Sequence, residues 1–291
     1  MINSRFFNWK FLVTGLLSLV FLVGINLYNS SRDQALSLAA VHQNDSPIPT
    51  ALAQTEPATP VITEQVEYAT VNGQKVTGYL ARPQNAMDGL PGVIAIHEWW
   101  GLNDNIEAVT RRLAGEGYQV LAVDLYNGQV AQSPEQAKEL MTKVSQNPAL
   151  AQENLQQAYT YLTEKLQAPK VGSIGWCLGG SWSLQTALLF PEELDATVIY
   201  YGGQIGEATR EQLSTLSMPI LGIFGAKDES IPLTTVREFE KTLKELGKQA
   251  DIQIYENAGH AFANPSGDRY VPEAAQKAWS ETTTFLAENL Q

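Results

Sequence analysis

The chain has 291 residues, of which 44% are apolar, so it can bury one full hydrophobic core. Acidic residues outnumber basic ones by 31 to 19, and residues 1–62 carry three of each sign. The acidic excess therefore lies on residues 63–291, which excludes nucleic acid and an anionic membrane surface as partners of that part. With Cys177 as its single cysteine, the chain has no internal disulfide and no CxxC-type metal site.

An uncharged and mostly apolar run fills residues 11–28, after the basic residues Arg5 and Lys10. The run is long enough to cross a bilayer as one helix. We therefore predict that residues 1–30 are a signal peptide or a transmembrane anchor in contact with the membrane. Either would make the following domain exported, that is, periplasmic or extracytoplasmic. Small residues typical of a cleavage site lie well beyond the run, which favours a retained anchor.

Residues 31–62 are rich in Ser, Ala, Gln, Thr and Pro, with apolar residues too scattered to form a face. This composition predicts a disordered linker. The folded domain is predicted to cover residues 63–291.

In the predicted domain, short apolar runs typical of strands alternate with longer amphipathic runs typical of helices. Two strand-like runs flank Asn72-Gly73 and predict a β-hairpin over residues 64–83. Further strands are expected at 92–98, 118–126, 170–175, 196–202, 219–225 and 250–256. Helices are expected at 103–117, in two stretches within 133–166, and at 179–190, 206–214, 232–247 and 272–289. This alternation requires crossover connections and predicts one α/β domain, with a mainly parallel sheet and helices on both faces.

Cys177 lies at the centre of Gly175-Trp176-Cys177-Leu178-Gly179, directly after a predicted strand and before a predicted helix. This is the G-x-nucleophile-x-G turn with cysteine in place of serine. The N-terminus of the helix carries a partial positive charge, which favours the thiolate. The alternative is that Cys177 is a small buried hydrophobic residue, as lone cysteines often are.

Asp228 and His260 also follow predicted strands. Because catalytic groups of parallel sheets collect beyond the carboxyl ends of the strands, both are candidates for the same site as Cys177. The chain order nucleophile, acid, base is that of the α/β-hydrolase arrangement. His260 would act as general base, Asp228 would orient the imidazole, and Cys177 would form a thioester. The alternative for Asp228 is that it caps the helix that begins near Pro232.

From about residue 64 to the end, the chain resembles the dienelactone hydrolase (carboxymethylenebutenolidase) family. The motifs that carry the resemblance are GWCLGG at 175–180, HEWWGLN at 97–103, VDLYNG at 123–128, GAKDESIP at 225–232 and AGHAF at 258–262. The resemblance implies the α/β-hydrolase fold and a triad of Cys177, His260 and Asp228. It also makes Glu98 an additional catalytic carboxylate that governs when the thiol becomes thiolate. The backbone N–H groups of Leu178 and Trp99 would form the oxyanion hole.

Two departures from the family pattern concern the substrate. The type enzyme of the family binds a substrate carboxylate with two arginines, and Gly128 and Asn264 stand at those positions here. Without them the bidentate clamp for a carboxylate is lost, so the substrate can be neutral. The aromatic residues near the catalytic segments are expected to line an acyl pocket or to pack in the core. They are Trp99, Trp100, Tyr126, Trp176 and Trp182.

The prediction is therefore a hydrolase that cleaves a small-molecule carboxylic ester or lactone through a cysteine thioester. The alternatives are a non-catalytic exported binding protein on the same fold and a thiol-dependent acyl transferase. No metal or organic cofactor is implied, and the sequence leaves the oligomeric state open.

Overall fold

The computed structural model describes residues 56–85 and 89–291. The segment predicted to be a signal peptide or anchor, and most of the predicted linker, lie outside these residues. Within the described ranges, no helix combines the length and the apolar character needed to cross a membrane.

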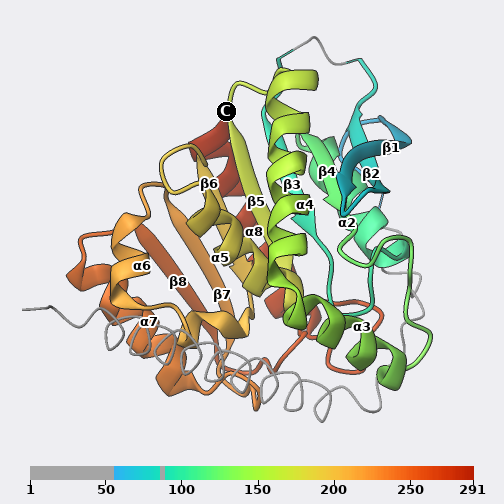
Figure 1. Cartoon of the computed structure of the whole chain (residues 1–291). Coiled ribbons are helices and arrows are strands. Elements are labelled where there is room, and N and C mark those ends of the chain that lie inside the picture. Colours follow the sequence, from blue (N-terminus) through green and yellow to red (C-terminus); the bar gives the residue numbers. More distant parts are fainter. Residues whose placement is uncertain (1–55, 86–88) are drawn as a thin grey trace, which may run out of the picture.

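One eight-stranded sheet forms the centre of the domain, with the strand order β1-β2-β4-β3-β5-β6-β7-β8 (Figure 1). The hairpin of β1 and β2 pairs antiparallel, as does β2 with β4, and all other neighbours pair parallel. The strands are β1 (Val61–Val71), β2 (Gln74–Pro83), β3 (Gly92–Ile96), β4 (Gln119–Val123), β5 (Val171–Trp176), β6 (Ala196–Tyr200), β7 (Ile220–Gly225) and β8 (Ala250–Tyr255). The predicted mainly parallel sheet is thereby confirmed.

The turn of the hairpin has the predicted residues. Asn72 and Gly73 both have positive φ, 49° and 74°, as a two-residue type I′ turn requires. The other end of the hairpin differs from the prediction, because Val61 and Ile62 pair with Pro83 and Arg82. The last two residues of the range predicted as linker therefore belong to the sheet.

Helices cover both faces of the sheet (Figure 1). On one face α2 and α8 lie side by side, and on the other α4 packs against α5 while α6 and α7 follow next to it. The helices are α2 (Asp104–Gly115), α3 (Pro134–Gln146), α4 (Pro148–Thr160), α5 (Leu178–Leu189), α6 (Arg210–Thr215), α7 (Leu233–Glu245) and α8 (Pro272–Leu290). Because both faces are covered, every residue of β3 to β7 is buried.

The helix predicted at residues 206–214 is instead a short 3₁₀ turn, Gly203–Gly206, followed by α6. Thr209 explains this division, since its side chain accepts the amide of Gln212 while the Gln212 side chain accepts the amide of Thr209. This reciprocal capping box sets the start of α6 at Arg210.

Candidate active site

Cys177 connects β5 to α5 in a strained turn. Its backbone has φ 57° and ψ −114°, a conformation rare for any residue except glycine. Flanking glycines permit the turn, because a Cβ on Gly175 would lie 2.0 Å from the Gly179 carbonyl oxygen. A Cβ on Gly179 would lie 2.1 Å from the carbonyl oxygen of Ile96, at the end of β3. The turn thus has the geometry of a nucleophile elbow, and it packs against the neighbouring strand.

Asp228 and His260 come from the loops after β7 and β8 and meet beside this elbow. Nδ1 of His260 and Oδ2 of Asp228 lie 2.7 Å apart, and both side chains are buried. The other carboxylate oxygen of Asp228 accepts the backbone N–H groups of Ser230 and Ile231 at 2.8 and 2.9 Å. No side-chain hydrogen bond caps α7. The Asp228 carboxylate therefore holds its own turn and His260, and it does not cap the helix.

Charges within the buried cluster set the protonation of His260. Burial alone would lower the pKa of its imidazole, but the negative charges of Asp228 and Cys177, with hydrogen bonds to both, raise it to about 10. For Asp228, burial raises the pKa, but His260 and the two backbone N–H groups outweigh this and lower it. The arrangement therefore favours an imidazolium between two anions, and a cationic imidazole favours the thiolate of a neighbouring cysteine.

Glu98 is also buried, at the end of β3, and its Oε2 accepts a hydrogen bond from Nδ2 of Asn264 at 2.7 Å. The carbonyl oxygen of Asn264 accepts from Nδ2 of Asn105 at 2.5 Å and from the backbone N–H of Ser266 at 2.9 Å. The amide of Asn264 is thus occupied on both sides by protein groups. In the family pattern an arginine at this position binds a carboxylate of the substrate. Here Asn264 binds the carboxylate of Glu98 instead.

Gly128 stands at the position of the second arginine, and its backbone conformation explains why an arginine does not fit there. Gly128 has φ 84°, and its N–H donates to the carboxylate of Asp124 in the turn after β4. Because this conformation favours glycine, an arginine here would strain the turn.

The segment after β3 that carries Trp99 is held by a buried histidine. Nε2 of His97 accepts the N–H of Leu125 at 3.1 Å, so Nδ1 carries the proton and donates to the carbonyl of Glu98 at 2.5 Å. Burial lowers the pKa of His97 and keeps the ring neutral. The hydroxyl of Tyr126 donates to the carbonyl of Trp99 at 3.0 Å. In a trans peptide the N–H points away from the preceding carbonyl, so the bond to the Glu98 carbonyl sets the direction of the Trp99 N–H, and the bond to the Trp99 carbonyl fixes the next peptide.

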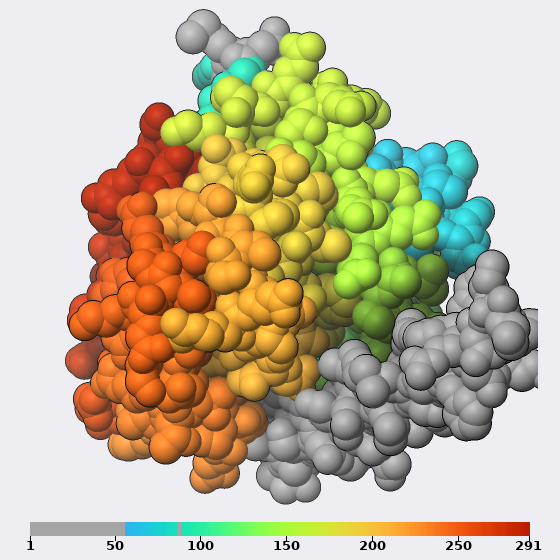
Figure 2. Space-filling model, turned by 60° about the vertical axis from the view of Figure 1, so that its left-hand side comes forward, coloured from blue at the N-terminus to red at the C-terminus, as the bar shows by residue number. Residues whose placement is uncertain are grey.

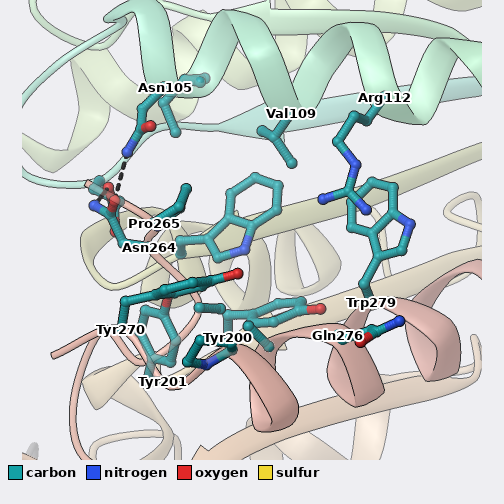
Figure 3. Close-up of a pocket in the computed structure, with 16 residues that line it drawn as sticks. Asn105, Val109, Arg112, Tyr200, Tyr201, Asn264, Pro265, Tyr270, Gln276 and Trp279 are labelled. Atoms are coloured by element: carbon teal, nitrogen blue, oxygen red, sulfur yellow. Dashed lines mark hydrogen bonds between the residues drawn. The ribbon is translucent and has the colours of Figure 1, made fainter. Parts of the chain in front are cut away.

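A cavity of about 310 Å³ opens next to Glu98, between α2 and α8 (Figure 3). Of the aromatic residues expected to form a pocket, Trp176 lines it, while Trp99, Trp100 and Trp182 are at most 3% exposed and pack in the core. The prediction missed several residues that line the cavity, namely Arg112, Tyr200, Tyr201, Tyr270 and Trp279. Tyr200 and Tyr201 were accessible to the same reasoning as the triad, because they stand at the end of β6.

Across the part of the chain that the structure describes, no group of three or more His, Cys, Asp or Glu side chains is placed to hold a metal ion.

The sheet order, the elbow at Cys177 and the His260–Asp228 pair define the class of protein, an α/β hydrolase. The profile of the Dienelactone hydrolase family matches residues 76–290, so the chain belongs to that family. Membership supports the activity of a carboxylic-ester or lactone hydrolase.

Individual relatives agree with this assignment. "Protein usf" of Aquifex pyrophilus is 37% identical over 226 residues, which cover 75% of this chain and 96% of the relative. "Putative carboxymethylenebutenolidase" of Aquifex aeolicus is 33% identical over 222 residues, or 74% of this chain and 94% of the relative. The crystal structure of a "Putative Dienelactone Hydrolase" from Klebsiella pneumoniae superposes with a TM-score of 0.72 at 30% identity, covering 79% of this chain and 100% of that one.

Replacement of Gly175 by alanine tests the packing of the elbow. The new methyl group would overlap the backbone of α5, so we expect Gly175→Ala to lower the free energy of unfolding by about 3 kcal/mol or more. Gly267→Ala is the matched control, because its Cβ would meet its nearest neighbour only at 3.7 Å and its cost should stay below about 1 kcal/mol. Urea denaturation of both variants measures the difference, and equal costs would contradict the packing argument.

The Asp228→Asn variant tests the electrostatics of His260. In the wild type the raised pKa means that the ion pair stabilises the fold fully below about pH 6.5 and progressively less as pH rises toward 10. Loss of the Asp228 charge should lower the pKa of His260 and weaken this dependence, because only the contribution of Cys177 remains. NMR titration of the imidazole follows the change directly. An unchanged midpoint in the variant would show that Asp228 does not govern His260.

Proposed function

We propose that the chain hydrolyses its ester or lactone substrate through a covalent thioester on Cys177, with His260 as base and Asp228 as its orienting acid. The observation that carries the proposal is the position of Cys177 at the strained elbow, within hydrogen-bond reach of an imidazole that Asp228 holds at 2.7 Å. A buried cysteine that only fills space needs neither a left-handed backbone nor a charged neighbour.

The reaction then follows two steps. His260 takes the thiol proton, the Cys177 sulfur attacks the carbonyl carbon, and the tetrahedral intermediate collapses to a thioester as His260 returns the proton to the leaving alkoxide. Water, deprotonated by His260, next attacks the thioester and releases the acid, and the proton returns to Cys177. The N–H groups of Leu178 and Trp99 would stabilise the negative oxygen in both steps.

Two features support this oxyanion hole. Leu178 is the first residue of α5. Its N–H is therefore one of those at the N-terminus of a helix that have no acceptor within the helix. The first turn of α5 packs against the end of β3, because the Cα of Gly179 lies close to the carbonyl groups of Ile96 and His97. This contact keeps the Trp99 segment next to the elbow.

Glu98 has a proposed role in controlling the thiol. Asn264 holds its carboxylate at 2.7 Å, and both residues lie in the wall of the cavity. A carboxylate that is buried near a thiol opposes formation of a second negative charge, so its position or protonation would influence when Cys177 ionises.

The location of the enzyme is a separate proposal that rests on the sequence. The apolar run after Arg5 and Lys10 supports export of the domain, with a membrane anchor or a cleaved signal. An acyl transferase would share the thioester and differ only in the molecule that accepts the acyl group.

Hydrolysis of 4-nitrophenyl acetate tests the proposed mechanism. We expect turnover by the wild type, and we expect Cys177→Ala and His260→Gln to lower kcat/KM by about 10²–10⁴-fold, since each removes the nucleophile or the base. Absence of turnover in the wild type, or full activity in Cys177→Ala, would refute the cysteine mechanism. Release of free acetate rather than its transfer to added alcohols distinguishes hydrolysis from acyl transfer.

Alkylation by iodoacetamide tests the charge state of the nucleophile. In the wild type the rate should reach half its maximum well below pH 8.5, where an ordinary cysteine ionises. His260→Gln should move this midpoint upward, because the neighbouring cation is lost. A wild-type midpoint near pH 8.5 would argue against an activated thiolate.

A further inference from the structure

The cavity beside Glu98 is a trough between α2 and α8 (Figure 3), and two of the residues that line it adjoin the proposed triad. Trp176 precedes Cys177, and the ring centroid of Tyr201 lies 5.1 Å from that of His260. A molecule bound at the triad can therefore extend into the trough.

The trough follows α2 away from the triad. Asn105 and Arg112 both line it and stand seven residues apart on this helix. At 1.5 Å per residue, Arg112 lies about 10 Å farther along the axis than Asn105, which contacts Asn264 at the near end. Figure 3 shows this order along α2, from Asn105 through Val109 to Arg112.

Arg112 supplies the charge at the far end. Its guanidinium lies 3.8 Å from the ring centroid of Trp279 on α8. Burial lowers the pKa of Arg112, although the group stays cationic. Within residues 56–85 and 89–291 it forms neither an ion pair nor a hydrogen bond, and Glu98 is the other charged residue that lines the trough. Glu116 acts on Arg112 through longer-range attraction only. A half-buried cation without a directly bonded carboxylate can bind one from a substrate.

Aromatic rings form the walls between the two ends. Tyr200 and Tyr270 lie below α2 in Figure 3, and Trp176 also lines the trough. Walls of this kind bind a flat apolar body by stacking and by excluding water. At the near end, the side-chain oxygen of Asn105 is buried and has no hydrogen-bond partner among the described residues, so it can accept a hydroxyl.

We propose that the trough is an extended substrate subsite for an elongated ester with a flat body and a carboxylate at its far end. The carboxylate would bind Arg112, about two helical turns from the near end and not beside the reacting carbonyl. The proposal rests on the proposed function for its link to turnover. Gly128 and Asn264 cannot bind an anion as the two arginines of the type enzyme do. The proposal assigns this recognition to Arg112.

Matched pairs of esters test the subsite on the full-length chain. One series consists of 4-nitrophenyl hemiesters of dicarboxylic acids of increasing length, and the other of acetyl esters of 4-hydroxyphenylalkanoic acids. Each has its neutral methyl ester as partner. In one of the two series, the wild type should hydrolyse the longer anionic esters more efficiently than their neutral methyl-ester partners. Arg112→Gln should reduce this preference by about tenfold or more, through KM.

Two variants show whether the effect is specific. Arg111→Gln removes the same charge one residue away, from a side chain that contacts Tyr79 and Glu107, and it should keep the preference. Arg112→Lys should retain part of it, because the charge remains while the planar stack on Trp279 is lost. The subsite is refuted if Arg112→Gln keeps the full preference in both series, or if Arg111→Gln loses as much.

A binding measurement separates this proposal from the catalytic one. By calorimetry, 4-phenylbutyrate should bind the wild type and Cys177→Ala alike, and Arg112→Gln about tenfold more weakly, whereas 4-phenylbutyramide should not distinguish the three. If no ester is hydrolysed but this pattern appears, the proposed function fails and the subsite stands. Equal binding of the carboxylate to all three proteins overturns the subsite.

Discussion

The backbone conformation of Cys177 is the constraint on which the rest of the active site depends. With φ at 57°, the chain leaves β5 and enters α5 in a single residue, and the thiol projects at the carboxyl edge of the sheet. The close approach of Gly175 to Gly179, and of Gly179 to the end of β3, leaves no room for a side chain. The same packing brings the first N–H group of α5 next to the segment that follows β3.

Around this elbow, the chain uses carboxylates and amides in distinct ways. Asp228 accepts hydrogen bonds from His260 and from the backbone amides of its own turn. Its negative charge therefore acts mainly on the imidazole. Glu98 is paired with Asn264, whose amide is then unavailable to a substrate. The positive charge that could meet a substrate anion lies instead on α2, at Arg112. The proposed subsite thus places recognition of a substrate anion on α2, apart from the candidate catalytic residues.

Most of the fold, and the positions of the three residues proposed as a triad, could be predicted from local patterns. Apolar runs predicted the central strands β3 to β7, because strands covered on both faces are apolar throughout, and the Asn72-Gly73 turn predicted the hairpin of β1 and β2. Cys177, Asp228 and His260 could be found because each follows a strand, and parallel strands end at one edge. The boundary at Val61 and the short α6 were predicted less well, since a pairing partner or a capping box shifts an element without changing its hydrophobic pattern.

The sequence by itself determined the α/β class, the order of the strands along the chain and the identity of the residues at their ends, because these depend on periodicity and glycine placement. Only the tertiary structure decided which side chains face one another. It paired Asn264 with Glu98, buried four of the tryptophans and put Arg112 against Trp279. Such contacts join residues more than a hundred positions apart. A local sequence pattern carries no information about which faces of two distant helices pack together.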